Sequence, residues 1–379
     1  MSYLPLAGVR VLEWARERPG PMAGRKLADL GAEVVKLSDA GREQGGDGVL
    51  WPVTDRNKLS VRIDFGTEEG RAAIRRLAEV ADVVLDGSRP GAFTARTGLD
   101  LADLRRRRPS VVVCSITGYG MTGPLSRHPA HAPNLDAMAG IGSAVRGDAG
   151  GWAFGARANL SVCVELGYLN GVIAILAALH GARETGQGAW IDLSLFDAAI
   201  EGDRRRLDRV LPGQTVQDPR SVDLRDLGAA RSAVYTSSDD RAVILMCAEQ
   251  KFWARFCRSV DREDLVARHA DGDAALQAEI QDIVSRRTAS EWLALFEEHE
   301  IAGSIMLHDR EVLEQPQFAA RDLLIEADGD RPPALADPIR WADHGGTRPG
   351  QDFTVPVLGA DTEDVLGRWL VAAPAGGER

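Results

Sequence analysis

A loop rich in glycine, proline and histidine follows a short apolar stretch that is typical of a buried strand. Residues 123–140 have the sequence GPLSRHPAHAPNLDAMAG, and of the seven histidines we expect His131 alone to lie in such a loop of the first domain. Histidine titrates near neutral pH, so His131 could remove a proton from a bound molecule or return one. A hydrogen-bonded loop histidine without catalytic role would show the same pattern, and His128 is expected at the surface.

Polar side chains that could assist such a proton transfer lie in this loop or after later predicted elements. Asn134 and Asp136 are close to His131, and we expect Asp136 to cap a helix that begins DAMAGIG. Glu165 lies near the start of a long apolar stretch, and Glu249 lies between a predicted strand and a predicted helix. Both glutamates also suit a helix N-terminus, where a carboxylate interacts favourably with the helix dipole without any further role.

Basic residues lie at the ends of several predicted strands. The turn ARERPGP contains Arg16 and Arg18, while Lys36 and Arg89 accompany later strands. Because the carboxyl ends of parallel strands share one edge of a sheet, these groups could converge on phosphates. Solvated loop arginines are the alternative. The turn lacks the G-x-G-x-x-G pattern, which disfavours a dinucleotide site of Rossmann type.

Segments typical of strands and helices alternate along the first half of the chain. Helix signals include Pro21 in a first turn, Thr67 at an N-cap, and Gly31 and Gly186 at C-caps. The pattern predicts an α/β fold with a parallel, doubly wound sheet. The expected strands are GVRVLEW, AEVVKL, KLSVRIDF, ADVVLDG, PSVVVCSITG and the start of GAWIDLSLFDAAIEG.

The alternation weakens at residues 203–228, which we predict to be a linker. Residues 229–328 are expected to form a smaller α+β domain, with a hairpin that turns at Asp239-Asp240 and amphipathic helices at KFWARFCRSV and ASEWLALFEEHE. The tail PVLGADTEDVLGRWL predicts a strand, a turn and a helix that return to the first domain. Residues 1–202 and 329–379 would then make up the large domain.

Composition excludes several classes of protein. The chain of 379 residues, 44 % of them hydrophobic, is long enough for a large core and two domains. A net charge of -11 argues against a nucleic-acid surface. Neither an uninterrupted membrane-spanning apolar run nor a signal peptide is evident, so we expect no membrane partner. The four cysteines are widely spaced, which predicts reduced thiols in a cytoplasmic protein and no metal site.

The chain resembles the family III CoA-transferases, a group that includes formyl-CoA and carnitine CoA-transferases and α-methylacyl-CoA racemase. The resemblance covers most of the chain and rests on motifs in family order, among them DRNKLSVRIDF, CSITGYGMTGP, ETGQGAWIDLSLFDAA and PVLGADTEDVL. It implies a Rossmann-like large domain completed by the C-terminal tail, a small α+β domain, and an interlocked ring-like dimer. It also implies coenzyme A as part of the substrate, with no permanently bound cofactor.

The resemblance implies roles for individual residues. A set of seven would contact coenzyme A, although DGSRPG replaces the Asn-aromatic pair that usually precedes the arginine: Arg18, Pro19, Lys36, Gly87, Ser88, Arg89 and Arg96. The aspartate nucleophile of the transferases lies in a Gly-aromatic-Asp motif. That motif corresponds here to Ala130-His131-Ala132, so the nucleophile is absent, and alanine cannot perform its covalent chemistry.

The racemase branch has Gly-His-Asp-x-Asn in this loop, and AHAPN retains the histidine and Asn134. In that branch the histidine is one base and an acid on the next long helix is the other. Glu165 lies one to two residues from the position of that acid, where Cys163 or Val164 falls directly. Glu249 matches a glutamate that lies near the histidine in racemases.

Our leading hypothesis is therefore an acyl-CoA enzyme that moves an α-proton, with His131 as base and Glu165, Glu249 and Asn134 in support. Such chemistry needs a base that can act near neutral pH and donors that stabilise the enolate oxygen. Backbone N–H groups of GYGMTG, or of the helix that carries Glu165, could be those donors. Alternatives remain: a non-catalytic or partner subunit beside an active paralogue, a diverged enzyme on a non-CoA substrate, and a transferase with another nucleophile. A homodimer is expected, or a heterodimer with an active paralogue.

Overall fold

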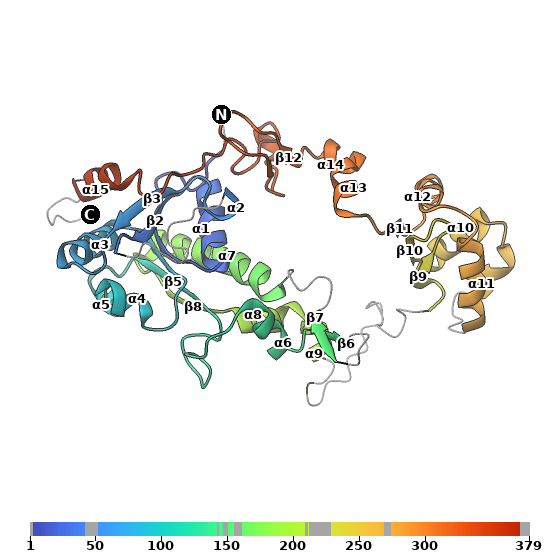
Figure 1. The fold of residues 1–379 in the computed structure, drawn as a ribbon, viewed down its shortest axis with the longest axis horizontal. Helices are drawn as coiled ribbons and strands as arrows, with labels where there is room; N and C mark the ends of the chain where they lie inside the picture. Colours follow the sequence, from blue (N-terminus) through green and yellow to red (C-terminus); the bar gives the residue numbers. More distant parts are fainter. Residues whose placement is uncertain are drawn as a thin grey trace. The chain divides into compact units, whose positions relative to one another are not determined.

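The computed structural model describes residues 3–41, 52–141, 144–146, 151–154, 161–208, 211, 229–268 and 274–371. The chain divides into two compact units (Figure 1). The large unit comprises Met1–Pro212 and Asp322–Arg379, and the small unit comprises Gly213–Arg321. Each unit is described by itself below.

A six-stranded sheet forms the centre of the large unit, and all its pairings are parallel. The order of its strands is β3-β2-β1-β4-β5-β8, which confirms the predicted doubly wound α/β fold. The direction of winding reverses between β1 and β4, because the chain builds the sheet outward from β1 on both sides. The strands are β1 (Arg10–Trp14), β2 (Glu33–Asp39), β3 (Leu59–Ile63), β4 (Val83–Asp86), β5 (Val112–Thr117) and β8 (Trp190–Ser194).

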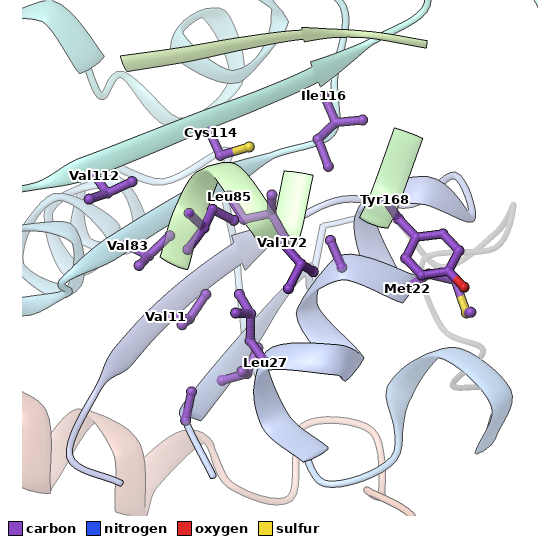
Figure 2. Packing of buried hydrophobic residues seen from close by; sticks show 14 of the residues in the cluster. Val11, Met22, Leu27, Val83, Leu85, Val112, Cys114, Ile116, Tyr168 and Val172 are labelled. Atoms are coloured by element: carbon purple, nitrogen blue, oxygen red, sulfur yellow. The ribbon is translucent and has the colours of Figure 1, made fainter. Parts of the chain in front are cut away.

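Helices cover both faces of this sheet, because successive residues of each strand point to opposite sides. Val11 of β1 lies in the core beneath one face and Leu12 in the core beneath the other. Figure 2 shows the first face, where Leu27 and Val172 approach Val11 and its neighbours. That face is covered by α1 (Pro19–Asp29), α7 (Val162–Thr185) and α8 (Leu195–Gly202), and the other by α3 (Glu68–Val80), α5 (Leu101–Arg107) and α15 (Thr362–Val371).

Local sequence signals set the ends of these helices. The Thr67 hydroxyl accepts a hydrogen bond from the Gly70 N–H at 3.0 Å and so caps α3, as predicted. Gly186 ends α7 with φ of 71°, a conformation that suits glycine. By length and composition α7 is the one described helix that could cross a bilayer, but here its residues, including Ile175, form part of the core above the sheet.

The C-terminal tail returns to the large unit, as predicted, but without the expected strand. Pro356 cannot donate to a strand ladder, and residues 353–357 adopt no regular structure. The tail is held by side chains instead: the Asp361 carboxylate accepts from the Ser60 N–H at 2.8 Å, and Trp369 of α15 is fully buried against α3.

The small unit contains an antiparallel sheet of order β11-β10-β9. Asp240 has φ of 58° in the predicted hairpin turn, a conformation that aspartate tolerates. Trp253, Phe256 and Trp292 are fully buried among its helices. Its elements are β9 (Ser232–Thr236), β10 (Ala242–Met246), α10 (Gln250–Ser259), η2 (Glu263–Arg268), α11 (Ala274–Val284), α12 (Ala289–Glu298), β11 (Gly303–Ile305), α13 (Asp309–Glu314) and α14 (Pro316–Ala320).

Shorter elements complete the large unit. They are α2 (Pro52–Asp55), α4 (Ala92–Thr97), α6 (Ala132–Met138), β6 (Ala144–Arg146), β7 (Trp152–Phe154), α9 (Arg204–Asp208), β12 (Leu324–Ile325), β13 (Ala334–Leu335) and η3 (Ala342–His344). Helix α9 lies within the range that we predicted as linker, whose later residues fall largely outside the described ones. Helix α6 begins in the histidine loop and leads to the site.

Candidate functional site

A cavity of about 380 Å³ opens in the large unit at the carboxyl ends of β1, β4 and β5. This is the point at which the winding of the sheet reverses, where doubly wound folds bind their ligands. Six segments line it: residues 17–20 after β1, residues 87–90 after β4, residues 116–118 at the end of β5, the loop and first turn of α6, the N-cap and first turn of α7, and Leu195 at the start of α8. We call this space the open cavity.

The first two segments approach each other closely because glycines face Ala15. A Cβ atom on Gly20 would lie 2.3 Å from the Ala15 Cβ, and one on Gly87 would lie 2.5 Å from it. Neither position can therefore take a larger residue without a backbone shift. The close approach brings the loop of Ser88 and Arg89 beside Arg18, the N-cap residue of α1.

His131 lies at the mouth of the open cavity as the N-cap residue of α6, and it is solvent-exposed. Its backbone N–H donates to the Asn134 Oδ1 at 3.0 Å. Asn134 thus fixes the backbone of His131 but is not among the residues that line the cavity. His128 is exposed, as expected, and also lines the cavity. Its position three residues before His131 is the sequence feature that could have indicated a place at the cavity.

Asp136 does not cap its own helix, which corrects our prediction. Helix α6 begins earlier, at Ala132, so Asp136 lies in its interior and points to another helix. Its carboxylate accepts from the N–H groups of Val162 and Cys163 in the first turn of α7, at 3.1 and 2.9 Å. Those two amides are therefore occupied and are not free to stabilise an enolate oxygen.

Glu165 lies in the first turn of α7 and lines the same cavity as His131. The Arg18 guanidinium donates to the Glu165 Oε1 at 3.0 Å, with the two side chains 53 % and 32 % exposed. The pKa of Tyr168 is raised, first by burial and then by the charge of the Glu165 carboxylate, which is hydrogen-bonded to the Tyr168 hydroxyl. Glu165 is thus a carboxylate held in place at the edge of the cavity, with access to solvent.

Ala132, which the resemblance matches to the transferase nucleophile, lines the open cavity. The nearby thiol of Cys163 donates to the Ala132 carbonyl oxygen at 3.7 Å. Burial raises the pKa of this thiol to about 12, so it stays protonated at neutral pH and is a poor nucleophile. The carboxylates among the lining residues are Glu17 and Glu165.

Two of the basic residues implied by the resemblance lie away from the cavity. The Lys36 Nζ is 2.5 Å from the Asp55 Oδ1, and Arg96 forms an ion pair with Asp39. Lys36 belongs to a group of charges that we call the buried ion cluster, with members Glu13, Lys36, Asp55 and Lys58. The Lys58 Nζ lies 2.7 Å from the Glu13 Oε2 and 3.3 Å from the Asp55 Oδ1. Desolvation raises the pKa of Glu13 and lowers that of Lys58.

The loop after β4 is supported by a buried carboxyl group. The Ser88 N–H and hydroxyl donate to the Asp86 Oδ1 at 2.9 and 2.6 Å. Burial raises the pKa of Asp86 to about 6, although these hydrogen bonds oppose the shift. Arg89 follows on the rim of the open cavity and is exposed.

Glu249 lies in the small unit as the N-cap residue of α10, where its carbonyl accepts from the Phe252 N–H at 3.0 Å. The predicted position before a helix is confirmed. Within the described ranges, no group of three or more His, Cys, Asp or Glu side chains could hold a metal ion. All four cysteines are buried, and none of them forms a disulfide bond.

Comparisons with known proteins agree on one family. The family model of CoA-transferase family III matches residues 6–362. The succinyl-CoA–D-citramalate CoA-transferase of Chloroflexus aurantiacus is 28 % identical, over 96 % of this chain and 93 % of its own. An alpha subunit of succinyl-CoA–L-malate CoA-transferase from the same organism is 29 % identical, over 79 % and 71 %. A crystal structure of Rv3272 from Mycobacterium tuberculosis superposes with a TM-score of 0.80 at 25 % identity, over 95 % of this chain and 98 % of that one.

Proposed function

Because the chain belongs to CoA-transferase family III, we propose that it acts on acyl-CoA thioesters as substrates and moves the proton on their α-carbon. The observation that supports this proposal is that His131 and Glu165 line one cavity, together with the Ala132 that the resemblance matches to the transferase nucleophile. Coenzyme A enters as part of the substrate, and no permanent cofactor is required by this chemistry.

We assign coenzyme A to the segments that line the open cavity beside β1 and β4. Arg18 and Arg89 provide positive charge there, and guanidinium groups suit bidentate contacts with phosphate. Pro19, Gly87 and Ser88 complete these two segments. In the geometry described above, Lys36 and Arg96 could contact the ligand only by giving up Asp55 and Asp39, so we assign them no direct contact.

In this proposal His131 takes the α-proton from one side of the acyl group. A neutral imidazole is a suitable base near pH 7, and Asn134 holds the backbone that carries it. Glu165, on the opposite helix start, returns a proton from the other side, which inverts the α-carbon.

A second candidate is CoA transfer with Glu165 as nucleophile, because the relatives reported above are CoA-transferases by name. The Glu165 carboxylate would attack the thioester carbonyl, the C–S bond would break, and coenzyme A would leave as thiolate while a mixed anhydride formed. Against it, the ion pair with Arg18 lowers the nucleophilicity of this carboxylate.

The test is exchange of the α-proton of 2-methylacyl-CoA in deuterated water, followed by NMR or mass spectrometry. We expect His131→Ala to lower the exchange rate at least a hundredfold, in the range of general acid–base catalysis. His180→Ala is the matched control, since His180 is exposed near the other end of α7. Equal exchange by the wild-type protein and His131→Ala would refute the proposal.

The two candidates differ in what Glu165→Gln does. Under the first, the variant loses inversion of configuration but retains part of its exchange through His131. Under the second, it loses transfer of coenzyme A from acyl-CoA to free carboxylic acids, measured by chromatography. Ala132→Asp then tests the site directly, because a gain of transfer would show that the cavity still binds both transferase substrates.

We also propose that the enzyme is a cytoplasmic dimer. Leu169 and Ile173 lie exposed one helical turn apart on α7 and suit an apolar interface. A homodimer is the simpler arrangement, and a heterodimer with an active paralogue is the alternative, as one relative is named an alpha subunit. Light scattering of the pure protein and of Ile173→Glu tests the homodimer, which the variant should weaken.

A further inference from the structure

Asp136 is a buried carboxylate that neither candidate reaction uses directly. Its side chain is 2 % exposed, and it lies on α6 after the histidine loop. Three donors from the start of α7 meet it: the Ser161 hydroxyl at 2.8 Å and the N–H groups of Val162 and Cys163. A carboxylate on the positive end of a helix dipole, with charge-assisted hydrogen bonds, makes a strong contact between two helices.

A second contact joins the same two helix starts. The Cys163 thiol donates to the carbonyl oxygen of Ala132, and the Ser161 hydroxyl lies 3.1 Å from the Cys163 sulfur. Asp136 therefore belongs to a small group that ties the first residue of α6 to the N-cap and first turn of α7. These contacts involve side chains and backbone atoms that are largely buried, so water screens them little.

We call these contacts of Asp136, Ser161 and Cys163 the tie between α6 and α7. The tie joins the two helix starts that carry the groups needed by the proposed chemistry. His131 is the N-cap residue of α6, and Glu165 is in the first turn of α7, where its N–H donates to the Ser161 carbonyl at 3.2 Å. Asp136 contacts neither side chain. It holds the backbone segments that carry them, so any shift of α7 against α6 would move Glu165 relative to His131.

We propose that Asp136 is a positioning residue that sets the separation of His131 and Glu165 across the open cavity. This inference rests on the proposed function in so far as His131 and Glu165 are the acting groups. It holds for proton transfer and for CoA transfer through Glu165 alike, because both need a carboxylate at a fixed place opposite the histidine loop. A misplacement of about 1 Å can cost a hundredfold in rate.

The test compares Asp136→Asn with Asp100→Asn. The amide introduced by Asp136→Asn would present an NH₂ group to one of the α7 N–H donors in place of an acceptor. Asp100 is the matched control, because it caps α5 by accepting from Ala102 and Asp103 and does not line the cavity. We expect Asp136→Asn to lower kcat at least tenfold with KM within twofold, and Asp100→Asn to leave both unchanged. A melting temperature lowered by Asp136→Asn with kcat per folded molecule unchanged would overturn the proposal.

A second readout does not depend on activity. Amide hydrogen exchange of a peptide covering residues 161–168 should be at least tenfold faster in Asp136→Asn, while the end of α7 near Thr185 should be unaffected. Unchanged exchange in the first peptide would refute the tie even if the wild-type protein proved inactive. Inactive wild-type protein with accelerated exchange would instead refute the proposed function and retain the tie. If Asp136→Asn does not fold, the same two measurements are made on Ser161→Ala, which removes one of the three hydrogen-bond donors to Asp136.

Discussion

The open cavity and the buried ion cluster both involve residues of the six-stranded sheet and its connections, but charged side chains are exposed in the first and buried in the second. Around the open cavity, Arg18, Arg89 and Glu165 keep access to solvent. In the buried ion cluster, Lys58 and Glu13 have fully buried side chains and satisfy each other. A basic residue on or beside a strand of this sheet is therefore not by itself a ligand-binding group.

This difference between the two regions shows that the ion partners of a charged side chain determine whether it can bind a ligand. Lys36 lies within β2 and is paired with Asp55, whereas Arg89 follows β4 and lies on the rim of the cavity. A buried charge without a partner is costly, so the ions of the buried cluster pair with one another. A group on an open rim meets no such requirement and stays available to a ligand. The following predictions test this contrast.

The largest effect is expected in the buried ion cluster. Lys58→Met removes the partner of Glu13 and leaves a buried carboxylate unpaired, which should lower the free energy of unfolding by about 3–5 kcal/mol. Lys251→Met, at an exposed lysine, should change it by less than about 0.5 kcal/mol. Urea unfolding of both variants measures the difference, and similar values for the two would break the contrast.

A smaller effect that depends on pH is expected at Asp86, which is buried like the cluster but has no ion partner among the described residues. Its pKa of about 6 in the folded protein lies above the ordinary value, so the protonated form is favoured by folding. Stability from this group is present at low pH and is lost as the pH rises through about 6. Between about pH 4.5 and pH 7 the loss is about 2 kcal/mol.

Asp86→Asn should abolish that loss, since an amide does not titrate in this range. The variant should gain stability relative to the wild-type protein between the two pH values, as measured by urea unfolding. A parallel pH dependence of the two proteins would show that Asp86 is ionised at both, as the exposed carboxylates are.

A third prediction concerns affinity at the open cavity. Arg89→Ala should weaken coenzyme A binding about tenfold, which is about 1.4 kcal/mol, and leave the free energy of unfolding almost unchanged. Lys36→Met should show the reverse pattern, with affinity within twofold and reduced stability. Calorimetry with coenzyme A and urea unfolding check both. Weaker binding by Lys36→Met would place this lysine at the ligand after all.

The smallest effect is expected at the ion pair on the cavity edge. Arg18→Gln removes the partner of Glu165, but both side chains are well exposed to water. The free energy of unfolding should change by less than about 1 kcal/mol. A loss of more than about 2 kcal/mol in urea unfolding would mean that this pair behaves like the buried ion cluster.

Much of the large unit could be predicted from local patterns. The apolar runs of β1, β2, β4 and β5 and the cap at Thr67 carry their own signals in neighbouring residues. The strand expected near Pro356 did not form, and α11 was not predicted. Pro356 removes a backbone donor from the expected strand, a local signal that the alternation of apolar residues did not include.

The candidate site was predicted less evenly. The loop of His131 and the first turn of Glu165 were expected near helix starts, and both are found there. That they line one cavity follows from the packing of α6 against α7, and no spacing in the sequence indicates it. The role of Asp136 was predicted wrongly, because its partners lie on another helix.

The sequence by itself determined the order of strands and helices and the loops that end at the sheet edge. These follow from residue type and short-range spacing. The tertiary structure alone decided which charges are consumed by partners and which remain open to a ligand. The physical reason is that burial and pairing depend on segments far apart in the chain, which only folding brings together.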